Sequence, residues 1–170
     1  MQAPTHILSG VLINKLFQWK RYRGIAFILM AFTCLLVHGL LDMLARFTYN
    51  PAEFSITDPF WLGYHIVVVL VSIVFLYLWW GEFKWGIIFS LLPDLEWLII
   101  GGQRLTNKEF IYYSKPYLHN AINSMYNLLQ AQSIPDFSPK PVACLVEVGV
   151  IVLLILLIRA IFNQRRNIHF

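Results

Sequence analysis

The sequence predicts an all-α integral membrane protein, a helical bundle of four to five transmembrane helices in a single domain over residues 1–170. Hydrophobic residues make up 58% of the chain and charged residues only 13%, whereas soluble domains average roughly 45–50% and about 25%. The mean hydropathy is +0.63. Several apolar runs also approach the length of about 20 residues that a helix needs to cross a bilayer. A soluble globule and a disordered chain are excluded, and with two cysteines so is a disulfide scaffold.

Three runs are long enough to span a membrane without help, namely residues 24–47, 60–80 and 141–162. Tryptophans stand at both ends of the second run, as at a membrane–water interface. Residues 85–100 are expected to form a further span that is broken at Pro93. Acidic residues follow this proline, and irregular backbone is tolerated at membrane depth only where protein or a water-filled cavity surrounds it.

The N-terminal run, residues 4–19, is the shortest candidate span, and it either crosses the membrane or lies on its surface. Apolar residues recur in it at helical spacing. Gly10 would permit close approach of another helix, so we expect this helix to pack into the bundle. The basic residues at the ends of the spans predict which side is cytoplasmic. On this topology residues 101–140 form an external loop.

Ionisable residues inside the apolar runs are the candidates for function, because a charge at the centre of a membrane helix costs at least about 2.5 kcal/mol. His38 and Asp42 stand four residues apart and share one helix face. They either bind one cation together or neutralise each other through a hydrogen bond. Asp94 and Glu96 either turn inward at the break or form a hydrated turn. Glu147 is expected to pair with a cation of the external loop.

Counted along the predicted helices at about 1.5 Å per residue, the candidates lie at a similar depth in the membrane. We therefore predict that His38, Asp42 and Asp94 converge, and that the N-terminal helix brings His6 to them. Imidazoles with carboxylates suit a divalent metal, Zn²⁺ above all, with Mn²⁺ or Fe²⁺ as alternatives. Such an ion would lower the pKa of a bound water and supply hydroxide near neutral pH.

Three short pieces carry a resemblance to a known family: Thr5-His6-Ile-Leu-Ser-Gly10, His38-Gly-Leu-Leu-Asp42 and Leu92-Pro93-Asp94-Leu-Glu96. In these pieces the chain resembles the membrane-bound metal-dependent hydrolases, the type that includes LexA-regulated hydrolases of the bacterial inner membrane. The family's usual Pro-Asp-x-Asp ends here in a glutamate. The resemblance implies metal-dependent hydrolysis, with roles for the residues that follow. The metal ligands would be His6, His38, Asp42, Asp94 and His119, and the catalytic residues Glu96, as a general base or further ligand, and His65, as an acid or further ligand.

Two other functions fit the same residues. The histidines and aspartates could relay protons in a small proton- or ion-coupled transporter subunit, or could lock helix packing in a non-catalytic membrane scaffold. For the hydrolase, the expected partners are the lipid bilayer and a lipid or lipid-linked phosphoester substrate. No nucleic-acid partner is expected.

Overall fold

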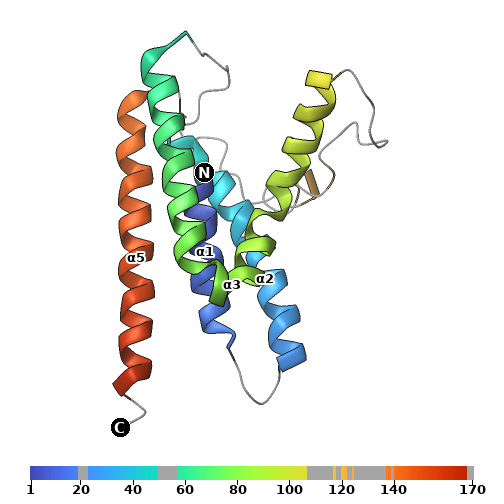
Figure 1. Cartoon of the computed structure of the whole chain (residues 1–170), viewed down its shortest axis with the longest axis vertical. Helices are drawn as coiled ribbons and strands as arrows, with labels where there is room; N and C mark the ends of the chain where they lie inside the picture. The colour runs from blue at the N-terminus through green and yellow to red at the C-terminus, as the bar shows by residue number, and fades with distance from the viewer. Residues whose placement is uncertain are drawn as a thin grey trace.

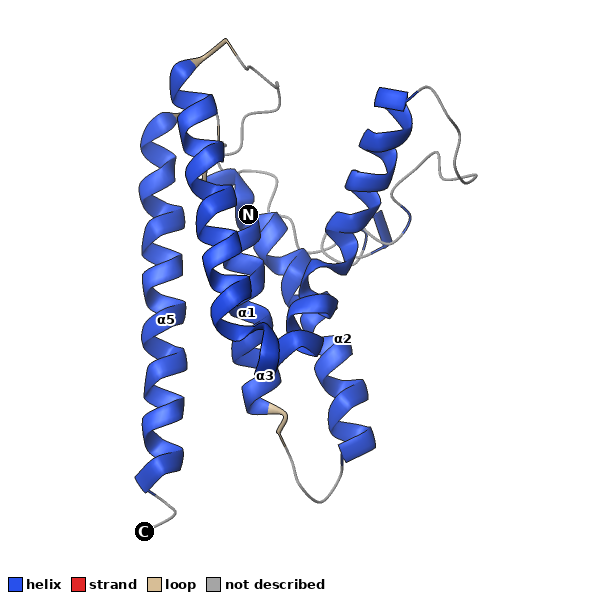
Figure 2. Ribbon diagram, in the orientation of Figure 1, coloured by secondary structure: helices blue, strands red, loops and turns tan. Residues whose placement is uncertain are grey.

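The computed structural model describes residues 1–18, 23–49, 57–106, 117, 120, 121, 124, 137, 138 and 140–167. Every regular element in these residues is helical, which confirms the predicted all-α class (Figure 2). In this part of the chain, three helices are long and apolar enough to cross a membrane: Arg23–Phe47, Pro59–Glu96 and Pro141–Asn163.

The outer surface of these three helices is apolar. In their most apolar stretches only 33%, 6% and 17% of the residues, respectively, are buried inside the protein. Soluble proteins rarely expose continuous apolar surface on this scale. This exposure is consistent with an integral membrane protein whose helices face lipid.

Helix α1 (Ala3–Leu16) forms the centre of the bundle and contacts α2, α3 and α5 (Figure 1). Almost its whole first half is buried, polar residues included. The prediction that the N-terminal helix packs into the bundle is therefore confirmed, and the alternative of a helix on the membrane surface is wrong. A helix that is apolar on most of its circumference has no face suited to water, so burial on every side is its stable position.

Glycines allow α1 and α3 to touch through their backbones. A Cβ atom placed on Gly10 would lie only 2.5 Å from the carbonyl oxygen of Gly86, and a Cβ on Gly86 would collide with the backbone of Gly10. Neither position can hold a larger residue without moving one helix. The predicted role of Gly10 in close helix approach is confirmed, and its partner is Gly86.

Helix α2 (Arg23–Met43) continues into a short 3₁₀ helix, η1 (Leu44–Phe47), and together they occupy the predicted span 24–47. Helix α5 (Cys144–Asn167) follows a 3₁₀ turn, η2 (Pro141–Ala143). Its inner face joins α1 and α3 in one apolar core that includes Leu8, Phe75 and Ile158.

Helix α3 (Pro59–Thr106) contains the two predicted helices 60–80 and 85–100, and its residue with non-helical dihedral angles, Phe83 (φ −117°, ψ 16°), falls in the gap between them. The predicted break at Pro93 is wrong, because the helix runs through this proline. Figure 1 shows the first part of α3 beside α1 and α5 and its last part turned away from them. The bend buries the Phe83 ring against Phe162, so packing decides where the helix bends. The helix also extends into the predicted loop 101–140, most of which lies outside the described residues.

Candidate metal centre

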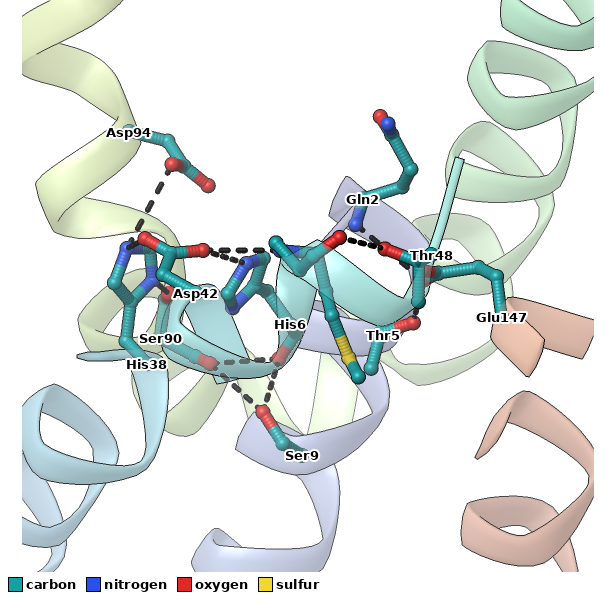
Figure 3. A network of polar contacts seen from close by, with 12 residues as sticks. Gln2, Thr5, His6, Ser9, His38, Asp42, Thr48, Ser90, Asp94 and Glu147 are labelled. Atoms are coloured by element: carbon teal, nitrogen blue, oxygen red, sulfur yellow. Dashed lines mark hydrogen bonds and ion pairs between the residues drawn. The ribbon is translucent and has the colours of Figure 1, made fainter. Parts of the chain in front are cut away.

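Two histidines and an aspartate meet where α1, α2 and α3 come together (Figure 3). One ligand atom from each of His6, His38 and Asp42 lies within 4.8 Å of the other two. The two oxygens of Asp42 face different rings: Oδ1 is 3.2 Å from His6 Nε2, and Oδ2 is 3.0 Å from His38 Nε2. The α-amino nitrogen of Met1 lies 3.1 Å from the same Oδ1.

Helical spacing and helix packing each supply part of this arrangement. His38 and Asp42 share a face of α2 as residues i and i+4, which the sequence predicted. His6 comes from the first half of α1, and only the burial of α1 in the bundle brings it to Asp42. Asp94 comes from α3, where its Oδ1 lies 3.7 Å from His38 Nε2. The predicted convergence of His38, Asp42 and Asp94 is confirmed, as is the approach of His6.

The backbone of α3 sets the orientation of His38. Nδ1 of this ring lies 2.8 Å from the carbonyl oxygen of Ser90. A carbonyl oxygen only accepts, so Nδ1 carries the proton and donates it. In the neutral ring Nε2 then presents its lone pair to the carboxylate oxygens of Asp42 and Asp94. Lone pairs facing one another require a positive charge between them, supplied either by a second ring proton or by a metal cation.

His6 is entirely buried, and its ring stacks on that of His38 with centroids 4.2 Å apart. Among the residues that the structure describes, His6 Nδ1 has no hydrogen-bond partner. Buried polar atoms are nearly always hydrogen-bonded. Nδ1 thus lacks the partner that usually orients a metal-binding imidazole, and the nitrogen of His6 that faces Asp42 is Nε2.

Two serines that sequence reasoning missed support the centre. The hydroxyls of Ser9 (2.8 Å) and Ser90 (2.7 Å) both donate to the carbonyl oxygen of His6, and they lie 3.1 Å from each other. These bonds tie the backbone at His6 to α3. A signal was present in the spacing, because Ser9 follows His6 by three residues and Ser90 precedes Asp94 by four, so each shares a helix face with its site residue.

The centre is closed on one side and open on the other. The side chains of His6 and His38 are 0% exposed, whereas those of Asp42 and Asp94 are 16% and 36% exposed. The carboxylate side of the group is thus partly exposed, while the imidazoles form its buried wall. Catalytic metal sites need such an open coordination position, and structural sites do not.

Two predicted site residues that the structure describes, Glu96 and His65, are not part of this group. Glu96 is buried on α3 two residues after Asp94. Because the helix is unbroken there, the two carboxylates leave it in different directions. His65 is stacked on Trp61 and its Nδ1 lies 2.8 Å from the carbonyl oxygen of that residue. His119 lies outside the described residues.

Glu147, which was expected to pair with a cation of the external loop, binds the start of α1; most of that loop lies outside the described residues. Its Oε1 accepts hydrogen bonds from the backbone nitrogen of Gln2 (3.3 Å) and from the hydroxyl of Thr5. Figure 3 shows this contact and the histidine–aspartate group on opposite sides of the same turn of α1.

Comparisons of the chain with protein-family models, with curated proteins and with solved structures give no match. The functional argument therefore depends on the geometry of the centre.

Proposed function

We propose that the protein is a membrane-embedded, metal-dependent hydrolase. Its metal ion is held by His6, His38 and Asp42, with Asp94 as a further ligand. The observation that carries the proposal is the convergence of these ligand atoms, within 4.8 Å for the first three, in a wall of fully buried imidazoles. A tetrahedral zinc ion with bonds of about 2.0–2.2 Å keeps its ligand atoms roughly 3.3–3.6 Å apart. The contacts of His6 with Asp42 Oδ1 (3.2 Å), of His38 with Asp42 Oδ2 (3.0 Å) and of His38 with Asp94 Oδ1 (3.7 Å) lie close to that range, with each histidine facing a different oxygen of Asp42.

The donor set also suits catalysis. Two neutral imidazoles and carboxylates are typical of zinc, and manganese or iron accept the same ligands. A metal ion here would supply a hydroxide nucleophile from bound water. The exposed side of Asp94 is where that water and the substrate would enter. Glu96 and His65 remain proposed proton-transfer residues, which would require movement of their side chains toward the centre.

The resemblance to the membrane-bound metal-dependent hydrolases supports the same reaction class and a place in the bacterial inner membrane. A lipid or lipid-linked phosphoester is the proposed substrate, since the centre is enclosed by helices whose outer faces are apolar. We also propose that α3 crosses the membrane twice and bends at Phe83. Its 48 residues extend about 70 Å at 1.5 Å per residue, more than twice the roughly 30 Å of a bilayer core. With α2 and α5 this makes four spans, and α1 would be the fifth.

The first test is metal content. Protein purified in detergent without chelator, then equilibrated with Zn²⁺ and desalted, should retain the ion when measured by mass spectrometry. His6→Ala and His38→Ala should lose it. His65→Ala is the matched control, because it removes an imidazole that lies outside the group, and it should keep the metal. Retention of the ion by both His6→Ala and His38→Ala, or no ion in the wild-type protein, would contradict the proposal.

A proton relay is the second candidate, and one observation favours it. His6, Asp42, His38 and Asp94 form a continuous series of titratable groups across three helices, with 3.0–3.7 Å between successive atoms. Reconstituted vesicles with a pH-sensitive dye in the lumen distinguish the two functions. Proton flux that Asp42→Asn abolishes, in protein free of metal, supports the relay. Release of phosphate-containing headgroups from lipid that depends on added metal supports the hydrolase.

A further inference from the structure

Glu147 is a buried carboxylate that the proposed reaction does not use. It lies on α5, far from His38 and Asp42 in the sequence, and is 2% exposed. Burial of a carboxylate is costly unless hydrogen bonds compensate for the lost water. Two donors at the start of α1 compensate its Oε1: the backbone nitrogen of Gln2 and the hydroxyl of Thr5. Among the described residues, Oε2 has no hydrogen-bond partner.

The contact takes the place of a helix cap. Gln2 is the N-cap residue of α1 and forms no capping bond with its own side chain. The first amide groups of a helix lack partners within the helix. Glu147 supplies an acceptor for the amide of Gln2 from another helix. The side-chain amide of Gln2 adds a bond of 3.2 Å to the carbonyl oxygen of Tyr49.

This anchor acts on the turn of α1 that carries His6. Thr5 immediately precedes His6, so a shift of the first turn would move the imidazole relative to Asp42, 3.2 Å away. On the other side, Ser9 and Ser90 fix the carbonyl oxygen of His6. The turn is therefore held from α5 and from α3 at once, as Figure 3 shows.

We infer that Glu147 is a positioning residue for the metal centre: by binding the first turn of α1 it holds His6 in the geometry of a ligand. The inference rests on the proposed metal centre. It assigns α5 a role in the site although α5 contributes no ligand to it. Groups that orient metal ligands typically change metal affinity about 10- to 100-fold when they are removed.

Paired variants separate the hydrogen bonds from the bulk of the side chain. Glu147→Leu removes the acceptor, while Glu147→Gln keeps an oxygen in its place. Thr5→Val removes the donor, while Thr5→Ser keeps it. As a control, Glu82→Gln weakens the exposed 3.3 Å contact between Glu82 and Lys15, which ties the opposite end of α1 to α3.

The measurements are Zn²⁺ affinity by chelator competition and the visible absorption of the Co²⁺-substituted protein, which reports ligand geometry. We expect Glu147→Leu and Thr5→Val to lower the affinity about 10- to 100-fold and to alter the Co²⁺ bands. Glu147→Gln, Thr5→Ser and Glu82→Gln should remain near wild type. If Glu147→Leu does not fold, the Thr5 pair decides the question by itself.

Two negative results have different meanings. Wild-type affinity and wild-type Co²⁺ bands in Glu147→Leu and Thr5→Val, even with a lowered melting temperature, would overturn the positioning role and leave the metal centre in place. A wild-type protein that binds neither Zn²⁺ nor Co²⁺ would overturn the metal centre itself, and the positioning role with it.

Discussion

The imidazole rings of His6 and His38 stack on each other, with centroids 4.2 Å apart and planes inclined by 24°, although they belong to different helices. The stack directs both Nε2 atoms to the carboxylate of Asp42. Two protonated rings at this separation would repel each other, and the repulsion is strong where water is excluded. One cation shared by both rings satisfies the carboxylate without that repulsion.

Metal affinity is expected to fall as the pH is lowered. A metal binds the deprotonated imidazole, so protons compete with it at the Nε2 atoms that face Asp42. Repulsion disfavours protonation of both stacked rings at once, so the logarithm of Zn²⁺ affinity, measured by competition in acidic solution, should rise with pH with a slope near that of one displaced proton. His65→Ala should leave the slope unchanged. A flat profile would contradict imidazole ligation.

Asp42→Asn tests the central carboxylate. The substitution keeps the size and hydrogen-bonding capacity of the side chain but removes its charge. If Asp42 is a ligand, the variant should insert and fold yet lose most of its metal and any hydrolytic activity, because a neutral amide binds a divalent cation far more weakly. If Asp42 only pairs with the histidines, metal content stays the same and the melting temperature falls, since a buried partner is left unsatisfied. Both quantities should be measured on one preparation.

Ser90→Ala should destabilise the fold by about 1 kcal/mol, the usual net value of one hydrogen bond. The hydroxyl of Ser90 bonds to α1 through the carbonyl oxygen of His6. Ser72→Ala is the control, because the hydroxyl of Ser72 bonds only to Val68, one turn earlier in α3. Thermal unfolding in detergent should show a lower midpoint for the first variant and almost no change for the second. Equal midpoints for the two variants would show that the hydrogen bond between the helices adds nothing to the stability of the fold.

Gly10→Ala and Gly86→Ala should each destabilise the protein by about 1–3 kcal/mol, the usual cost of overpacking, because the new Cβ meets backbone that cannot rotate away. Gly63→Ala, also in α3, is the matched control. A Cβ at Gly63 meets nothing within 4 Å, and alanine is favoured over glycine within a helix by roughly 1 kcal/mol. This variant should unfold at the same temperature or higher. A neutral Gly10→Ala would contradict the close crossing of α1 and α3.

Much of the candidate site could be predicted from residues on one helix. His38 and Asp42 share a face because of the helical repeat alone, and the cost of burying such residues in an apolar run pointed to a partner or a ligand. The bend of α3 at Phe83 falls in the gap between the predicted helices 60–80 and 85–100. The further break predicted at Pro93 does not occur, because neighbouring groups can satisfy the backbone that a proline frees in a membrane helix. The bend occurs at Phe83, whose ring is buried against another helix.

The sequence by itself determined the helical class, the apolar spans and the His38–Asp42 pair, because composition and helical periodicity are local properties of the chain. The tertiary structure alone decided which other groups reach that pair. It placed His6 against Asp42, brought the carbonyl oxygen of Ser90 to His38 and connected Glu147 to the first turn of α1. These contacts join residues on different helices, and no periodicity within one helix specifies how another helix is rotated and shifted against it. That register is set by packing, above all by the contact of Gly10 with Gly86.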